Sequence, residues 1–96
     1  MEKGKYILTR ILNDGGFTIM HPVLTDDKNA MKERMKNVLA IERDVESITD
    51  EQFEQILAEK PESYQFSEDR AHAIVEKDGE WAEFTWYMAE NKRVEK

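Results

Sequence analysis

The pattern of hydrophobic and polar positions predicts a β-hairpin in the C-terminal part of the chain. Apolar and polar residues alternate on both sides of Asp78-Gly79, a pair typical of a type I′ turn, in which both positions need positive φ. This turn sets Lys77 opposite Glu80, Val75 opposite Ala82, Ala73 opposite Phe84, and Ala71 opposite Trp86. One side of the ribbon is then apolar throughout: Ala71, Ala73, Val75, Ala82, Phe84, Trp86 and Met88. A slip of one residue would send this whole set into water, so the register is well specified.

The opposite side of this hairpin mixes aromatic, aliphatic and charged side chains. It holds Arg70, His72, Ile74, Glu76, Trp81, Glu83, Thr85 and Tyr87. A solvated sheet face commonly has this composition. An interaction surface is the less common alternative, since Trp, Tyr and Arg are enriched at interface hot spots.

A second hairpin is predicted near the N-terminus. Residues 6–12 and 17–20 are rich in β-forming side chains, and residues 13–16, Asn-Asp-Gly-Gly, have turn chemistry. Pro22 restricts His21 to extended geometry, so it ends the second strand or places it at an edge.

The first of two helices is predicted after Thr25 or Asp26, either of which can cap it. Its apolar stripe follows the i, i+4, i+7, i+8 pattern: Met31, Met35, Val38 and Leu39. We place its end near Ala40, although residues 38–45 also suit an extended segment.

The second helix has a clearer start, because Thr49 and Gln52 match a capping box and Ile48 and Phe53 match a hydrophobic staple. Its apolar residues are Phe53, Ile56 and Leu57, and Pro61 stops it near Lys60. Residues 61–69 form a loop with a short extended piece at 64–66.

These elements predict a single small α+β domain over residues 1–96. Their order is ββααββ, with two β-hairpins forming an antiparallel sheet and two helices packed on one face. The apolar fraction of 40% is ordinary for one core of this size.

The composition also narrows the classes of function. The chain has no cysteine, which excludes disulfides, thiolate catalysis and cysteine-ligated zinc. The apolar stretch at residues 6–12 is short and contains Thr9 and Arg10, so it fits neither a signal peptide nor a transmembrane helix. We expect a cytoplasmic protein with no membrane association.

Charge is distributed unevenly along the chain. Residues 42–69 hold ten acids against two bases, a net charge of −8, whereas the whole chain carries −7. Such a block is either a solvated face or a surface for a basic partner, and a pI near 4.8 argues against direct nucleic-acid binding. A third reading is internal pairing. Lys28, Lys32 and Lys36 recur every fourth residue and could neutralise acids of the second helix.

The sequence contains no catalytic or metal-binding signature. His21 precedes Asp26 and Asp27, but helix capping accounts for those acids better than metal ligation does. His72 lies across the predicted hairpin from Thr85 and diagonal to Glu83, as cross-strand polar pairs on exposed faces commonly do. We expect no enzymatic activity, no metal and no cofactor.

The leading hypothesis is a small acidic binding or inhibitor protein, of a type common among phage and mobile-element accessory genes. It would mimic DNA and block a basic, nucleic-acid-binding site on a partner protein. The candidate contacts are Asp50, Glu51, Glu54, Glu59, Glu62, Glu68 and Asp69.

Residues 46–63 of 96 comprise Glu46-Ser47-Ile48, the acidic helix after it, and Lys60-Pro61-Glu62-Ser63. This stretch resembles the phage uracil-DNA glycosylase inhibitors. The resemblance implies an acidic protein that mimics DNA and fills an enzyme's binding groove. The hairpin-first layout and residues 81–88 depart from that family's pattern.

The alternative hypothesis is a protein-interaction module or homodimer that uses the mixed side of the C-terminal hairpin. Trp81 and Tyr87 would be its anchors, with Arg70, His72 and Glu83 around them.

Overall fold

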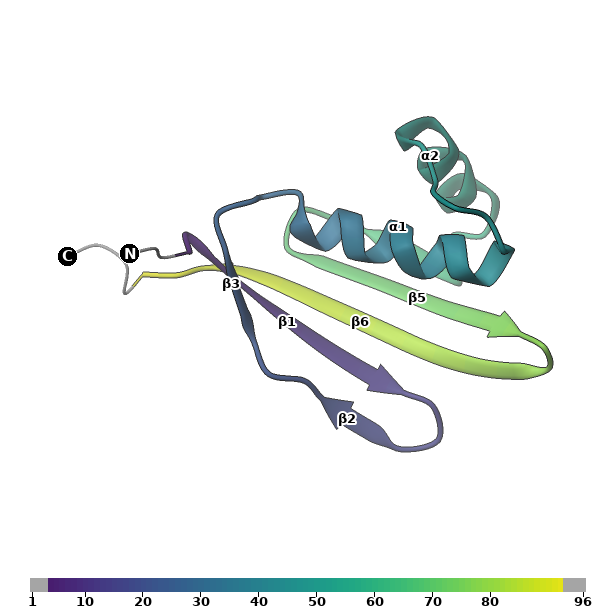
Figure 1. Ribbon diagram of the computed structural model, residues 1–96, viewed down its shortest axis with the longest axis horizontal. Helices are drawn as coiled ribbons and strands as arrows, with labels where there is room; N and C mark the ends of the chain where they lie inside the picture. The colour runs from purple at the N-terminus through teal and green to yellow at the C-terminus, as the bar shows by residue number, and fades with distance from the viewer. Residues whose placement is uncertain (1–3, 93–96) are drawn as a thin grey trace.

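The computed structural model describes residues 4–92, which form an α+β fold with one antiparallel sheet (Figure 1). The elements are β1 (Tyr6–Asn13), β2 (Phe17–Ile19), β3 (Val23–Thr25), α1 (Ala30–Arg43), α2 (Asp50–Glu59), β4 (Tyr64–Phe66), β5 (Arg70–Lys77) and β6 (Glu80–Glu90). The strands run in the order β2-β1-β6-β5-β4, and β3 pairs with β1 on the same edge as β2. The predicted fold class is confirmed. The short extended piece predicted at residues 64–66 is present as β4, and β3 is a further short strand that was not predicted.

The C-terminal hairpin has the predicted turn and register. Asp78 and Gly79 have φ of 54° and 82°, as a type I′ turn requires. All four expected cross-strand pairs occur, from Lys77 with Glu80 to Ala71 with Trp86. The apolar side of the ribbon faces the helices, with Ala71 and Ala73 fully buried.

The N-terminal hairpin is also present, with Asn13 opposite Phe17. After the break at residues 20–22, the chain resumes pairing with β1 as β3, where Thr25 lies opposite Tyr6. Strand β1 is also paired with β6 along its whole length and so joins the two hairpins into one sheet. Pro22 therefore interrupts an edge, as expected of a residue that cannot donate a backbone hydrogen bond.

The first helix starts and ends later than predicted. Its N-cap position is Asn29, while the Thr25 hydroxyl and Asp27 carboxylate accept backbone N–H bonds within the preceding turn. Asp44 adopts the left-handed conformation after the last turn, and Val45 N–H donates to Ala40 O at 3.0 Å. This is a Schellman ending with aspartate in the position that glycine most often occupies. Residues 38–43 are therefore helical, which excludes the extended alternative for them.

The second helix begins as predicted. Thr49 accepts the Gln52 N–H at 3.1 Å, and Gln52 Oε1 accepts the Thr49 N–H at 2.9 Å, which completes the capping box. Ile48 and Phe53 are both buried, as a hydrophobic staple requires. The helix ends at Glu59, two residues before Pro61.

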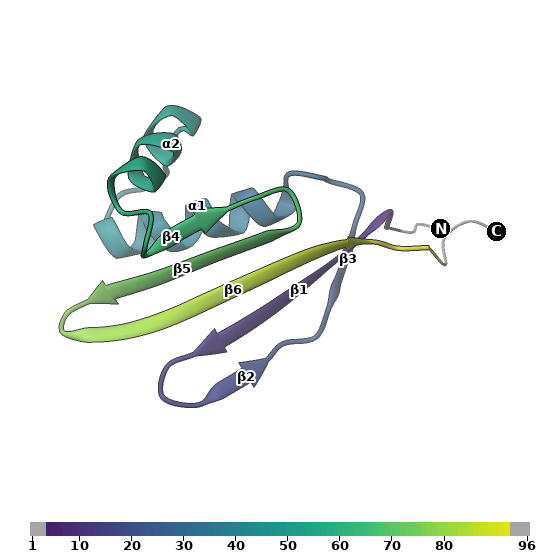
Figure 2. The ribbon, with the colours of Figure 1, turned by 180° about the vertical axis from the view of Figure 1, so that it is seen from behind.

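Both helices lie on the same side of the sheet. The core packs α1 against β5 and β6 through Met31, Met35 and Leu39, and it packs α2 beside β4, where Phe53 meets the Phe66 ring edge-on at 5.4 Å. Seen from behind, no helix covers the other side of the sheet (Figure 2). We call this side the outer face.

Candidate functional site

Three carboxylates of the acidic block, those of Glu42, Asp44 and Asp50, form ion pairs within the molecule, whereas several others do not. Asp50, the first residue of α2, lies 2.8 Å from Lys36 Nζ and 3.4 Å from Lys32 Nζ. The hydrogen bond from Lys36 and the nearby charge of Lys32 hold the pKa of Asp50 below its ordinary value. The internal pairing that the sequence analysis left open as an alternative is therefore present for this residue.

The other predicted acidic contacts are exposed and unpaired. Glu51, Glu54, Glu59, Glu62 and Glu68 are all exposed. Within residues 4–92, none of these five carboxylates forms an ion pair or a side-chain hydrogen bond. Asp69 is also exposed, and within residues 4–92 its carboxylate accepts only the Ser67 hydroxyl, at 3.3 Å. By helix geometry, Glu51 lies opposite the buried Phe53 and Ile56 of α2, and Glu54 and Glu59 lie on its two flanks.

Sequence reasoning missed the internal role of Glu42, which belongs to the same acidic block. Its carboxylate accepts the Tyr64 hydroxyl and the Glu76 N–H, each at 2.9 Å, and also pairs with Arg43 at 2.7 Å. Burial, with the hydrogen bond to Glu42 as the second cause, raises the pKa of Tyr64. Glu42 therefore ties α1 to β4 and β5, a role that only the tertiary structure reveals.

The mixed side of the C-terminal hairpin forms half of the outer face. Trp81 and Tyr87 are 51% and 41% exposed, and Arg70 is exposed directly opposite Tyr87. Trp81 and Tyr87 stand six residues apart on β6, about 20 Å along an extended strand, so they do not form one cluster.

The predicted His72 and Glu83 pair is present at the centre of this face. His72 Nε2 lies 2.6 Å from Glu83 Oε2, and Asn13 Nδ2 donates to Glu83 Oε1 at 3.0 Å. These two donors hold the pKa of Glu83 below its ordinary value. The ionised carboxylate can only accept, so Nε2 carries the proton of that hydrogen bond.

The N-terminal strands extend the outer face with apolar side chains that the sequence analysis did not include. By the pairing register, Phe17, Ile19 and Leu24 lie on this face, and they are 76%, 72% and 59% exposed. The register of the N-terminal hairpin could have predicted this placement. Leu12 points inward, so its neighbour Ile11 points to the outer face, and Ile19 lies opposite Ile11. The interaction surface considered for the C-terminal hairpin is thus wider than predicted.

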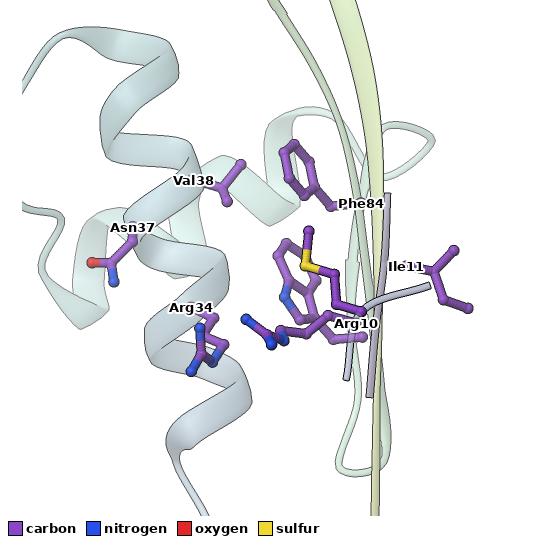
Figure 3. Close-up of a pocket in the computed structure, with 8 residues that line it drawn as sticks. Arg10, Ile11, Arg34, Asn37, Val38 and Phe84 are labelled. Carbon is purple, nitrogen blue, oxygen red and sulfur yellow. The ribbon is translucent and has the colours of Figure 1, made fainter. Parts of the chain in front are cut away.

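A pocket of ≈ 190 Å³ opens on the helix side, where α1 meets β1 and β6. Figure 3 shows Arg10 extending from β1 toward α1, which carries Arg34 and Asn37, whereas Ile11 points away through the sheet. Phe84 and Trp86 contribute aromatic rings to the wall. No sequence motif marked this pocket, because its arginines stand 24 positions apart on different elements.

Within residues 4–92, no group of three or more His, Asp or Glu side chains is arranged to hold a metal ion. Near His21, Asp26 accepts the Lys5 N–H at 2.9 Å, and Asp27 accepts the Asn29 N–H at the same distance. Neither of the two helices within residues 4–92 is long and apolar enough to cross a membrane.

Compared with protein-family models, curated proteins and solved structures, the chain gives no match.

Proposed function

We propose that this protein is a small, non-enzymatic binding protein that uses the exposed acids of α2 to block a basic, nucleic-acid-binding site on a partner protein. We assign this role to the cytoplasm and to the phage or mobile-element accessory type, in line with the cysteine-free, acidic composition. The contact surface is the acidic ridge, which we define as Glu51, Glu54, Glu59 and Glu62.

The observation that carries this proposal is the unpaired state of the ridge. The neighbouring Asp50 is neutralised by Lys32 and Lys36, whereas none of the ridge carboxylates forms an ion pair within residues 4–92. The ridge also stands at the rim of the fold, because α2 packs beside the edge strand β4 rather than across the sheet (Figure 2). A protruding negative ridge can enter a basic cleft, and long-range attraction speeds the encounter.

The test compares two variants that each remove three negative charges. The ridge variant carries Glu51→Gln, Glu54→Gln and Glu62→Gln. The matched control carries Glu76→Gln, Glu80→Gln and Glu90→Gln, three exposed acids of β5 and β6. Each tagged protein is used to capture partners from a bacterial lysate at low salt, followed by elution with rising salt.

The wild type and the control should retain a basic nucleic-acid-binding protein that elutes with salt, because screening weakens exposed charge pairs. The ridge variant should lose it, and duplex DNA should compete for the same partner. Equal retention by all three proteins, or capture of no basic protein, would contradict the proposal.

A second candidate function is homodimerisation through the outer face. Six large hydrophobic side chains on this face are more than a third exposed: Phe17, Ile19, Leu24, Ile74, Trp81 and Tyr87. The six strands, which have 3 to 11 residues each, offer roughly 600 Å² before side-chain relief is counted, close to the ~800 Å² per partner of a standard interface. A second copy suits this face because it lacks the ridge acids, so two chains can meet there with their acidic ridges apart.

Sedimentation equilibrium tests this second function with Ile19→Lys and Tyr87→Lys, each compared with Ile41→Lys. Ile41 is 64% exposed but lies on α1, away from the outer face. The wild type and the Ile41→Lys control should dimerise. In Ile19→Lys and Tyr87→Lys, dimerisation should be weakened at least about tenfold. A wild type that stays monomeric at millimolar concentration would exclude this function and leave the acidic-ridge proposal intact.

A further inference from the structure

The pocket between α1 and the sheet combines two arginine side chains with an apolar wall. Arg10 and Arg34 contribute the cationic groups and Asn37 an amide, and Phe84 and Trp86 contribute aromatic rings (Figure 3). Its volume of ≈ 190 Å³ is several times the roughly 30 Å³ that one water molecule takes up in the liquid. The pocket therefore has room for a small organic molecule.

Arg10 has hydrogen-bonding capacity that the protein does not use. One terminal nitrogen, Nη2, donates to the His21 carbonyl at 3.2 Å. Nε is buried, and no acceptor within residues 4–92 receives its proton. A guanidinium has five N–H donors in a planar fork that matches carboxylate and phosphate oxygens, and a buried donor without an acceptor is costly.

The pocket also lacks a compensating negative charge. None of its lining residues is acidic, and within residues 4–92 neither Arg10 nor Arg34 forms an ion pair. Other cations of the fold do have carboxylate partners, among them Lys36, Arg43 and Lys77. Two uncompensated arginines at one pocket in a chain of net charge −7 mark a local site for an anion.

The wall of the pocket indicates what the anion is attached to. The Phe84 and Trp86 rings lie nearly parallel, with 9° between their planes and 5.7 Å between their centroids. Val38 and Met20 complete the apolar lining. Such a surface favours a flat, apolar body, which loses water contact on binding while its charged end meets the arginines.

We propose that this pocket binds a small organic anion, in which a carboxylate or a phosphate is joined to a flat apolar group. Arg10 holds the anionic group through Nε and its terminal nitrogens, Arg34 adds a second charge from α1, and the flat body lies toward Phe84 and Trp86. The site is separate from the acidic ridge, and its test does not depend on the protein partner.

Three probes of similar shape test the inference: benzoate, phenyl phosphate and the neutral benzamide. One readout is the NMR resonance of the Arg10 Nε–H group, which reports directly on the donor that lacks an acceptor. A second is the fluorescence of Trp86, recorded in a Trp81→Phe background so that only one indole contributes. Benzoate or phenyl phosphate should give saturable changes in both signals, and the comparison of the two identifies carboxylate or phosphate as the preferred group. Benzamide should give neither.

Substitutions of single arginines test which side chains bind the anion. Arg10→Met and Arg34→Met keep the apolar stem and should each weaken binding at least about tenfold, because each removes a charged donor. Arg70→Met, an arginine exposed on β5, is the matched control and should bind as the wild type does. If Arg10→Met fails to fold, Arg34→Met and the wild-type Nε–H shift still decide the question. Absence of a saturable shift with either anion, an equal response to benzamide, or equal weakening by Arg70→Met would overturn the proposal.

Discussion

Lys36 on α1 and Asp50 at the start of α2 are joined by a 2.8 Å contact between Nζ and Oδ1. Their charges support each other: the hydrogen bond to Asp50 raises the pKa of Lys36, and the same bond lowers that of Asp50. Asp50 also lies in the first turn of α2, where the helix dipole favours a negative charge. The contact links the two helices, and it distinguishes Asp50, which is paired, from the unpaired acids of the acidic ridge beside it.

Asp50→Asn should slightly lower the midpoint of urea unfolding, and this difference from the wild type should shrink as salt is added, because the pair is exposed. The same variant should leave capture of a basic partner unchanged, since its charge is already neutralised by lysines. Urea titrations at low and high salt, followed by the lysate capture, check both halves. If the single substitution Asp50→Asn abolishes capture of the basic partner, Asp50 belongs to the contact surface.

Glu83 should make stability depend on pH in the acidic range. Hydrogen bonds from His72 and Asn13 lower its pKa in the folded protein from the ordinary 4.5. A carboxylate with a depressed pKa stabilises the fold above its unfolded pKa, and the contribution is lost as pH falls through the folded value. Glu83→Gln should therefore lose less stability than the wild type as pH falls below 4.5.

Urea unfolding across about pH 7 to pH 3 measures this difference. Glu80→Gln, at an exposed position of the same strand, should retain the wild-type pH profile. If the Glu83→Gln and wild-type profiles are parallel, the hydrogen bonds to Glu83 do not persist in solution.

Thr49→Ala should destabilise the fold by about 1 kcal/mol, the usual cost of losing an N-cap side chain. The variant leaves the Gln52 N–H without its acceptor and breaks one half of the capping box. Ser47→Ala is the control, since Ser47 is exposed and its hydroxyl makes no hydrogen bond among residues 4–92. Thermal or urea unfolding compares the two, and equal stability would mean that water replaces the cap without cost.

Gly79→Ala should cost roughly 1–2 kcal/mol, because φ of 82° places an L-residue in the left-handed region. A Cβ at this position would meet nothing within 4 Å, so the cost is purely conformational. Gly16→Ala is the matched control, since Gly16 lies in an equally open turn without a positive φ. Urea unfolding that shows the same small change for both variants would argue against the type I′ turn.

Local features of the sequence predicted the elements whose signals lie within a few residues. The turn at Asp78-Gly79 fixed a register of cross-strand pairs, and the Thr49 and Gln52 box fixed the start of α2. The end of α1 was missed because the residue that ends it in the left-handed conformation is Asp44. An aspartate, unlike a glycine, does not mark that conformation in the sequence. The start was missed because Thr25 and Asp27 form side-chain turns of their own before the helix.

The sequence by itself determined the two hairpins, the two helices, the apolar side of the sheet and the excess of acid in residues 42–69, since each follows from periodicity, turn chemistry or counting. Only the tertiary structure decided which acids remain unpaired, because Asp50 and Glu42 find their partners 14 and 34 positions away. It also brought Arg10 and Arg34 to one pocket and gathered Phe17, Ile19 and Tyr87 on one face. Contacts between residues so far apart in the sequence depend on how the strands and helices pack, and no local pattern in the chain predicts them.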